Sequence, residues 1–461
     1  MSTISLSNVS FSYDASNIIL DDVSVVFTDS ERVAIVGDNG AGKTTMLKLL
    51  AGDIVPDSGH VSCGASVYMT RQINAATSKS GGERQSTELA RAFDSGAAIL
   101  LLDEPTNNLD AEARRRFFNN LASYPFGAVI VSHDRELLRQ VDRIIEIRQG
   151  RIRVWGGNYD FWIAGRCAEQ ENIFAKYTAA QKEISRLGAT MNIAQNTRQH
   201  HEVKQRKEIV NTRRSRIAAN ALKGKSQETE AKRRAIIQQK LNTQMELRQA
   251  LSTQMQEDKI KIPLPSKPFY SKELVYISGL VFGYDAATVL NNFNLVMFGG
   301  QRIRITGRNG AGKSTLLKII CGNLTPRAGR VKTFGKIAYL DQDLSLLDKN
   351  KSVVDNIVDI AGVRSHDAHV IAANFGFRGD SSKKQVGILS GGELLKATLA
   401  AILGGENQPD LLILDEPTNN LEIKSIAILE DALNQYRGAI LLVSHDEMFV
   451  KNIKIDYEIQ I

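Results

Sequence analysis

The chain has 461 residues, of which 43% are hydrophobic and 24% charged, a composition typical of soluble globular proteins with two or three domains. It contains no apolar run of the ~18 to 20 residues that a membrane-spanning helix needs, and its N-terminus lacks the pattern of a secretory signal, so we expect a cytoplasmic protein. The three cysteines form no CxxC pair and have no neighbouring histidine at ligand spacing, which argues against disulfides and a zinc site.

The net charge of +7 is concentrated in one segment. Residues 166–262 contain 20 Lys or Arg and 10 Asp or Glu, so the rest of the chain is slightly acidic. This segment is almost free of glycine and is followed by prolines at 263, 265 and 268, which indicate a domain boundary.

The first phosphate-binding motif, GDNGAGKT at 37–44, follows an apolar run at 33–36 that predicts a buried parallel strand. A helix is expected directly after it, and in this context the motif predicts a P-loop, whose backbone N–H groups and helix N-terminus bind phosphate. Lys43 is expected to reach the β and γ phosphates, and Thr44 to offer its hydroxyl to Mg²⁺. The predicted ATP-binding residues are Gly37, Asp38, Asn39, Gly40, Ala41, Gly42, Lys43, Thr44 and Thr45.

Acidic side chains follow a second apolar run, at 99–102. Asp103 is placed to hold Mg²⁺ through water and Glu104 to orient or deprotonate the attacking water, because the carboxyl ends of parallel strands form the ligand-binding crevice of α/β sheets. A third apolar run, at 128–131, leads to His133 on the same edge, where it is expected to contact the γ-phosphate. The alternative is that these residues only cap strands.

The same pattern restarts after the prolines. A strand at 302–306 leads to GRNGAGKS at 307–314, apolar residues 411–414 lead to Asp415 and Glu416, and residues 440–443 lead to His445. Ser314 and Asp415 are the second pair of predicted Mg²⁺ ligands. The predicted ATP-binding residues of the second motif are Gly307, Arg308, Asn309, Gly310, Ala311, Gly312, Lys313, Ser314 and Thr315.

Three further motifs indicate a family. SGGE at 80–83, DEPTNNLD at 103–110 and SHD at 132–134, which recur as SGGE at 390–393, DEPTNNLE at 415–422 and SHD at 444–446, resemble those of ATP-binding cassette ATPases. The resemblance implies signature loops at Ser80, Gly81, Gly82 and at Ser390, Gly391, Gly392. It also implies Q-loop glutamines with catalytic and Mg²⁺-binding roles at Gln72 and Gln342, and adenine-stacking tyrosines at Tyr13 and Tyr284.

The chain departs from that family pattern in two places. About seven residues separate Gln72 from Ser80, so the first repeat has lost most of the usual helical subdomain, whereas about 47 residues separate Gln342 from Ser390 and predict that the second repeat keeps it. Glu422 stands where the family has an aspartate, which keeps a carboxylate but lengthens its reach.

The resemblance also implies that each ATP site combines parts of both repeats. The first site would pair Lys43 and Glu104 with the signature loop at 390–392, and the second would pair Lys313 and Glu416 with the loop at 80–82. ATP would then hold the two halves of a monomer together, and hydrolysis would release them.

The basic middle segment has the pattern of two helices. Ile173, Tyr177, Ile184, Leu187 and Met191 form one apolar stripe, and Ile237, Leu241, Met245, Leu251 and Met255 form a second, less regular one. Two helices of about 30 residues each, packed antiparallel, would form a rod about 45 Å long. Its basic tip is expected to bind RNA phosphates, or alternatively to be a solvated hairpin with no partner. The predicted RNA-binding residues are Lys204, Arg206, Lys207, Arg213, Arg214 and Arg216.

From end to end the chain resembles the ABC-F family of tandem ATP-binding cassette ATPases, including the family's linker entry, WGGNYDFW at 155–162. This implies an α/β fold with two P-loop cassettes, 1–164 and 269–461, joined by a long antiparallel helical hairpin, 165–268. It also implies a partner, the ribosome with its rRNA and P-site tRNA, and a role in translation or in antibiotic resistance. The segment at 424–453 is similar to the antibiotic-resistance branch of this family. The alternatives are a membrane importer subunit, a DNA repair or chromosome ATPase, and a scaffold with inactive sites.

Overall fold

The computed structural model describes residues 2–14, 17–70, 81–107, 109–211, 232, 235–252, 262–263, 272–284, 287–341, 344–419 and 421–461, with 81–83 and 194–211 as backbone only. These residues form two compact units. One contains Met1–Trp162 and Asp258–Ile461, and the other contains Ile163–Glu257. The domain boundaries expected from the sequence, at 164/165 and 268/269, stay predictions.

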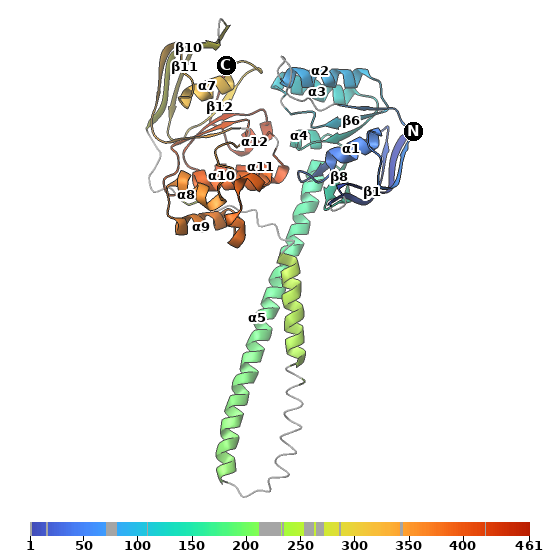
Figure 1. Cartoon of the computed structure of the whole chain (residues 1–461), viewed down its shortest axis with the longest axis vertical. Coiled ribbons are helices and arrows are strands. Elements are labelled where there is room, and N and C mark those ends of the chain that lie inside the picture. The colour runs from blue at the N-terminus through green and yellow to red at the C-terminus, as the bar shows by residue number, and fades with distance from the viewer. Residues whose placement is uncertain are drawn as a thin grey trace. The chain divides into compact units, whose positions relative to one another are not determined.

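The first half of the larger unit contains two sheets (Figure 1). A three-stranded antiparallel sheet has the order β2-β1-β4, and a six-stranded sheet has the order β5-β6-β7-β3-β8-β9. The second sheet is parallel except for β9, which pairs antiparallel with β8. The strands are β1 (Thr3–Asp14), β2 (Asn17–Thr28), β3 (Arg32–Gly37), β4 (Ser58–Cys63), β5 (Val67–Met69), β6 (Ile99–Asp103), β7 (Gly127–Val131), β8 (Arg143–Arg148) and β9 (Arg151–Gly156).

Strands β3, β6 and β7 form at the apolar runs 33–36, 99–102 and 128–131, where the sequence predicts them. Residues Ile99–Asp103 and Gly127–Val131 are buried throughout, as expected for parallel strands covered on both faces. Helix α1 (Lys43–Ala51) packs in the core between the two sheets. The helices α2 (Gly81–Asp94) and α3 (Ala111–Ser123) contribute to a core on the other face of the parallel sheet, and α4 (Arg135–Leu138) follows β7.

The second half repeats this architecture. Its antiparallel sheet has the order β11-β10-β13, and its parallel sheet has the order β14-β15-β16-β12-β17. The strands are β10 (Glu273–Tyr284), β11 (Ala287–Phe298), β12 (Arg302–Thr306), β13 (Ala328–Thr333), β14 (Ile337–Leu340), β15 (Leu411–Asp415), β16 (Ala439–Val443) and β17 (Tyr457–Gln460). Helix α7 (Lys313–Ile320) takes the place that α1 has in the first half.

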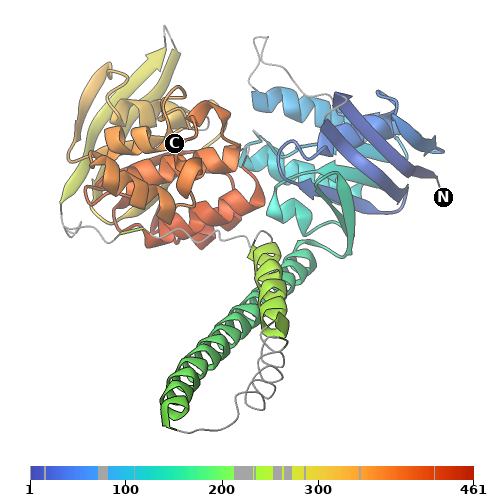
Figure 2. The same cartoon turned by 60° about the horizontal axis from the view of Figure 1, so that its bottom comes forward.

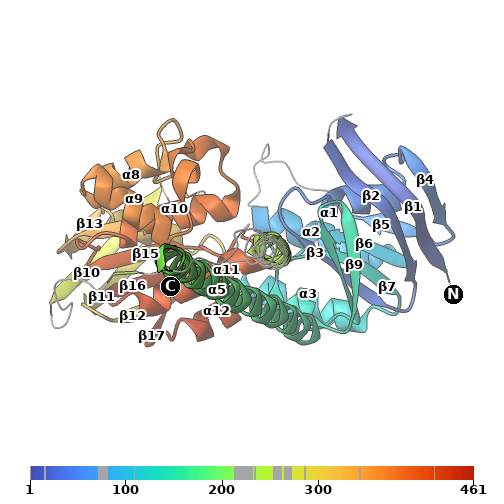
Figure 3. The same cartoon turned by 90° about the horizontal axis from the view of Figure 1, so that it is seen from below.

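The second half also has the helical subdomain that its sequence predicts. Between β14 and the second signature motif lie α8 (Val353–Ala361) and α9 (Ser365–Asn374), which pack with α10 (Gly391–Leu403) in one apolar core (Figure 3). Helices α11 (Ile423–Gln435) and α12 (Glu447–Asn452) complete this half. The expected loss of the subdomain from the first half concerns residues 73–79, which lie outside the described residues.

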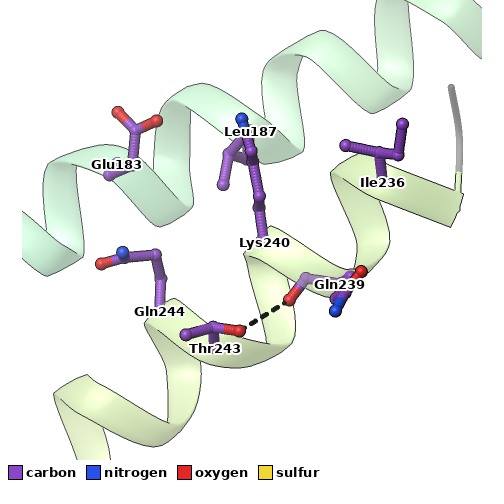
Figure 4. A pocket seen from close by; sticks show the side chains of 7 residues that line it. All are labelled: Glu183, Leu187, Ile236, Gln239, Lys240, Thr243 and Gln244. Carbon is purple, nitrogen blue, oxygen red and sulfur yellow. Dashed lines mark hydrogen bonds between the residues drawn. The ribbon is translucent and has the colours of Figure 1, made fainter.

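The smaller unit contains two helical segments that lie side by side and antiparallel (Figures 1 and 2). Helix α5 (Tyr159–Asn211) has 53 residues, so the expectation of about 30 was wrong for this helix. The second segment is described at 235–252, and Arg248 Nη1 donates to Gln181 Oε1 across the pair (3.0 Å). A groove of about 420 Å³ lies between the segments (Figure 4). It is lined by Glu183, Leu187, Ile236, Gln239, Lys240, Thr243 and Gln244.

The apolar stripe predicted for the first helix is confirmed. Leu187 is buried, and the other four stripe residues are partly buried. In the second segment Ile237 and Leu241 are partly buried and Leu251 is buried, but Met245 is 43% exposed and lies off the contact face. The contact face of this segment consists of the partly or fully buried residues 237, 241, 244, 248 and 251. Two of them, Gln244 and Arg248, are polar, since long polar side chains can cover apolar surface with their stems. Among the described residues, no helix is both long and apolar enough to cross a membrane.

Candidate nucleotide-binding sites

Both P-loops have the strand-loop-helix structure that their sequences predict. β3 ends at Gly37 and α1 begins at Lys43, while β12 ends at Thr306 and α7 begins at Lys313. The residue before each helix is a glycine with φ near +100°, a conformation that side chains with a Cβ rarely adopt. A Cβ added to Gly42 would lie 2.6 Å from the side chain of Ile19 in β2, and one added to Gly312 would lie 2.6 Å from the side chain of Val289 in β11. These glycines therefore let the loop turn tightly at the helix N-terminus.

The P-loop lysines are buried and bind backbone carbonyls of their own loops. Lys43 Nζ donates to the carbonyls of Gly37 (2.8 Å) and Asp38 (3.2 Å), and Lys313 Nζ donates to those of Gly307 (2.7 Å) and Arg308 (3.1 Å). Burial lowers the pKa of both lysines, although nearby carboxylates oppose this effect. Each ammonium group is thus positioned inside a loop suited to phosphate.

The two predicted catalytic glutamates follow their strands in the same strained conformation. Glu104 has φ of 46° and Glu416 has φ of 48°, which is uncommon for a residue other than glycine. The backbone N–H of each bonds to the neighbouring strand, at Val131 O (2.9 Å) and Val443 O (2.8 Å). This anchoring holds both carboxylates at the carboxyl edge of the parallel sheets.

The predicted histidines lie beside these glutamates. His133 N–H donates to Glu104 Oε2 (3.4 Å) and His445 N–H to Glu416 Oε2 (3.2 Å), with ring Nε2 to Oε1 distances of 3.6 Å and 3.4 Å. Among the described residues, neither buried Nε2 has a hydrogen-bond partner. An unsatisfied buried nitrogen of this kind is costly, and the oxygen of a terminal phosphate is a suitable partner for it.

Burial sets the titration of these groups. It raises the pKa of Glu104 to about 8, against the opposing charge of Lys43, and the pKa of Glu416 to about 7. Burial, followed by the nearby P-loop lysine, lowers the pKa of His133 to about 3 and that of His445 to about 4. At neutral pH both histidines are therefore neutral, and both glutamates are close to their titration range.

The predicted Mg²⁺ ligands are present, and their oxygens suit that ion. Thr44 Oγ1 donates to Asp103 Oδ2 (2.9 Å), so these two ligands lie side by side. In the second site Tyr339 donates to Asp415 Oδ2 (3.1 Å), and Asp415 Oδ1 is buried with no hydrogen-bond partner among the described residues. In the described part of the chain, no group of three or more His, Cys, Asp or Glu is arranged so that it could hold a metal ion, but Mg²⁺ beside a nucleotide needs only one or two such ligands because phosphates supply others.

The predicted adenine-stacking tyrosines are exposed and lie beside the P-loop helices. Tyr13 is 60% exposed, and its hydroxyl is 3.3 Å from Thr45 Oγ1, while Tyr284 is 51% exposed and 3.2 Å from Thr315 Oγ1. The exposed rings are accessible to a base, and their hydroxyls link them to the predicted phosphate-binding helices.

Contacts within the larger unit connect each P-loop to the other half. Asn39 N–H donates to Glu422 Oε1 (2.6 Å), and Asn309 N–H donates to Asp110 Oδ2 (3.4 Å). Asp110 also caps α3 by accepting from Ala113 N–H (2.9 Å), whereas Glu422 makes no such cap on α11. The longer Glu422 side chain therefore contacts the opposite P-loop without capping its own helix.

Each P-loop also makes an ion pair with the other half. Asp38 pairs with Lys424 (2.9 Å) and Arg308 with Glu112 (2.8 Å). Asp38 and Arg308 occupy the same position in the two P-loops, and Lys424 and Glu112 occupy the same position in the two repeats. The two ion pairs thus occupy equivalent positions, but the P-loop residue is acidic in the first pair and basic in the second.

The signature loops are described in part. Ser390 caps α10 in a capping box with Glu393, and Gly391 lies next to the first P-loop, since a Cβ added to it would be 4.0 Å from Asn39 Nδ2. Gly81 and Gly82 are at the N-terminus of α2. The predictions for Gln72, Ser80 and Gln342 lie outside the described residues. So do those for Arg213, Arg214 and Arg216, while Lys204, Arg206 and Lys207 lie in α5 without described side chains.

Three contacts near the sites were not predicted from the sequence. Tyr339 bonds to Asp415, Arg135 pairs with Glu430 of the other half (2.7 Å), and Arg304 bonds to the loop that carries the second histidine. Only Arg304 had a sequence signal, a charged residue inside a strand that is otherwise suited to burial.

The repeated fold and its two P-loop sites define the class of ATP-binding cassette ATPases. A family model described as "ABC transporter" matches residues 20–77 and 290–419. The ATP-binding protein Uup of Caulobacter vibrioides is 30% identical over 489 residues, covering 95% of this chain and 74% of that protein. ABC transporter F family member 2 of Arabidopsis thaliana is 28% identical, covering 98% and 75%, respectively. The chain belongs to the ABC-F family.

Other comparisons agree with this assignment. The energy-dependent translational throttle protein EttA of Mycobacterium tuberculosis is 27% identical, covering 94% of this chain and 87% of that protein. Among solved structures, the archaeal ribosome recycling factor aABCE1, in complex with the ribosomal stalk protein aP1, has a TM-score of 0.58 and 18% identity, covering 97% of this chain and 86% of that chain. This likeness supports the fold, and the expected fold class of two tandem P-loop cassettes joined by an antiparallel helical hairpin is confirmed.

Proposed function

We propose that the protein is a cytoplasmic, Mg²⁺-dependent ATPase that binds the ribosome and uses ATP-driven closure of its two cassettes to place the helical linker near P-site tRNA and the peptidyl transferase centre. The observation that supports the ATPase most directly is that each half supplies the same set of parts, a P-loop lysine, a strained glutamate and a neutral histidine. Each half also supplies a carboxylate to the P-loop of the other.

In this proposal Lys43 and Lys313 bind the phosphates of two ATP molecules, and Glu104 and Glu416 orient the attacking waters. In the tautomer that carries its proton on Nε2, each histidine donates a hydrogen bond to an oxygen of the terminal phosphate. Mg²⁺ would be held by Thr44, Asp103 and Gln72 in one site and by Ser314, Asp415 and Gln342 in the other, where it would neutralise phosphate charge.

The ribosomal part of the proposal has separate support. The chain belongs to a family with a relative that is named a translational throttle protein, and its segment 166–262 carries twice as many basic as acidic residues. Such a charge excess favours RNA, whose phosphates would make binding depend strongly on salt. Within this role, the protein acts either as a translation factor or as an antibiotic-resistance protein that protects the ribosome. The alternative is an ATP-binding subunit of a membrane importer, for which the long basic linker has no evident use.

The test is a double variant, Glu104→Gln with Glu416→Gln, which keeps the P-loops but removes both water-orienting carboxylates. We expect it to bind ATP, sediment with 70S ribosomes and arrest translation in a cell-free system. The matched control, Lys43→Met with Lys313→Met, should do none of these. Normal ATP binding by the first variant without co-sedimentation would refute the ribosomal role and leave the ATPase intact.

Two further experiments separate the finer roles. Shortening the linker between Gln199 and Lys225 should preserve ATP hydrolysis but abolish the effect on translation, and an unchanged effect would refute the role of the linker. Drug susceptibility of a sensitive bacterium that expresses the wild-type protein then distinguishes a resistance protein from a translation factor.

A further inference from the structure

A buried arginine lies in β12, the strand between β16 and the edge strand β17 of the second parallel sheet. In β12, Arg304 pairs in register with Leu442 of β16 on one side and with Glu458 of β17 on the other. The residue is only 4% exposed. Burying a guanidinium group is costly unless hydrogen bonds and opposite charges compensate, so its partners indicate why it is there.

The partners of Arg304 include the loop that carries the second-site histidine. Its Nε and Nη2 both donate to the carbonyl of Ser444 (3.2 and 2.9 Å), the residue directly before His445. Its Nη2 and Nη1 form a bidentate pair with Glu447 (2.6 and 3.2 Å), the first residue of α12. Nη1 also pairs with Glu458 (2.9 Å). The planar guanidinium group therefore holds this loop from both sides of the histidine.

The first half holds its histidine loop differently. The position of Arg304 is taken by Ala34, which pairs in register with Ile130 and Ile144. The position of Glu447 is taken by Arg135, which pairs with Glu430 of the other half. The two loops thus have equivalent backbones but different supports.

We propose that Arg304 is a positioning residue of the second ATP site, which holds His445 against Glu416 through the carbonyl of Ser444 and has no counterpart in the first site. This inference rests on the proposed ATPase function of that site. The two distances between the histidine and the glutamate agree with tighter support, since both are 0.2 Å shorter in the second site than in the first.

The charge of Arg304 acts in the same direction on both groups. It adds to burial and Lys313 in lowering the pKa of His445, and with Lys313 it opposes the burial that raises the pKa of Glu416. The other charged groups that act on this pair are Asp110, Arg114 and Asp415.

The strand also offers a matched control, Arg302. It is two residues before Arg304, and its Nη2 donates to the carbonyls of Leu433 (2.8 Å) and Tyr436 (3.0 Å), which are away from the histidine loop. The first half has an arginine, Arg32, at the equivalent position. Arg302→Met therefore removes an arginine with similar carbonyl bonds from the same strand without affecting the proposed support.

The experiment measures ATP turnover with one site active at a time. In a Glu104→Gln background, which leaves the second site active, we expect Arg304→Met to lower kcat about tenfold with KM changed less than twofold, because the arginine positions other groups and does not touch nucleotide. In a Glu416→Gln background the same substitution should leave the rate unchanged. Equal losses in both backgrounds, or no loss in either, would overturn the proposal.

A second measurement does not depend on turnover. The chain has seven histidines, and the ring resonances of His445 can be assigned in labelled protein by His445→Gln. They should shift in Arg304→Met and remain in place in Arg302→Met. Arg304→Lys, which keeps the charge but cannot form the bidentate pair with Glu447, serves if the methionine variant does not fold and should lower kcat in the Glu104→Gln background. Identical resonances in the wild type and both Arg304 variants would refute positioning even if the protein had no ATPase activity.

Discussion

Glu416→Gln should stabilise the nucleotide-free protein, and more so as the pH rises. The carboxyl group has a side chain that is only 11% exposed, and burial raises its pKa from 4.5 to about 7. Below pH 4.5 the carboxyl group is protonated in both the folded and the unfolded protein, so its ionisation does not change the free energy of unfolding. Between pH 4.5 and 7 the folded protein keeps a proton that the unfolded protein has released, and stability declines as the pH rises.

Above pH 7 the decline is complete. The rise of the Glu416 pKa from 4.5 to about 7 lowers the free energy of unfolding by about 3 kcal/mol, because a tenfold change in an equilibrium constant corresponds to about 1.4 kcal/mol. Glutamine carries no charge and avoids this penalty, so the melting temperature of Glu416→Gln should exceed that of the wild type by several degrees at pH 8 and by little at pH 4.5. The free energy of unfolding falls with rising pH because the pKa of Glu416 is higher in the folded protein than in the unfolded protein.

The measurement is differential scanning calorimetry without nucleotide at pH 4.5, 6, 7 and 8. Glu406→Gln is the control, because it removes a carboxylate from an exposed position. A stability difference between Glu416→Gln and the wild type that does not grow with pH, or a less stable variant at pH 8, would refute the reasoning that a buried carboxylate is held at this site at a cost to stability.

The remaining predictions concern the same unit. If Glu104 and Glu416 are the catalytic groups, as proposed, ATP turnover at saturating ATP should fall as the pH is lowered from 8 to 7, because both become protonated there. A rate that stays constant from pH 9 to 6 would contradict this. Asp110→Ala should lower the free energy of unfolding by about 1 kcal/mol, because it removes the cap of α3, and Glu422→Ala should lower it less, because Glu422 does not cap α11. Thermal unfolding measures both values, and equal losses would contradict the difference in capping. Lys424→Glu should weaken the contact with Asp38 by up to about 1 kcal/mol, and Asp38→Lys in the same chain should restore it in a double-mutant cycle, whereas simple additivity would show that the pair does not interact.

The strands and P-loops were predictable because their signals are local. The run at 33–36, followed by glycines and a lysine, specifies a buried strand, a tight phosphate loop and a helix start without reference to the rest of the chain. The structure places β3, the loop and α1 as expected. The same reasoning placed β12 at Arg302–Thr306.

Helix packing in the smaller unit was less predictable. The sequence pattern predicts about 30 residues, but α5 has 53, because its apolar stripe ends at Met191 whereas the helix continues to Asn211. Met245 was assigned to the contact face from its hydrophobicity, whereas Gln244 and Arg248 are the partly buried residues at that part of the helix. Side-chain stems can cover a helix contact, and no hydrophobicity pattern reveals this.

The supports of the sites depend on contacts between distant segments. The loop around Ser444 is 140 residues from Arg304, and the sequence shows only an arginine in a strand. The partner of Arg135 is 295 residues away. Motifs can therefore indicate the groups that are proposed to act on ATP, whereas the contacts that hold these groups depend on the tertiary structure.

The charges next to the two P-loops favour the pairing of unlike cassettes. Within one chain Asp38 meets Lys424 and Arg308 meets Glu112. If two copies of the first cassette faced each other in the same geometry, Asp38 would meet Glu112, and two copies of the second would bring Arg308 against Lys424. Each arrangement would replace two attractive pairs with two repulsive ones, and repulsion of this kind discriminates between partners even where each attractive pair contributes little. The opposite charges at equivalent positions thus disfavour pairing of like cassettes from separate chains and leave the two unlike cassettes of one chain as the matched partners.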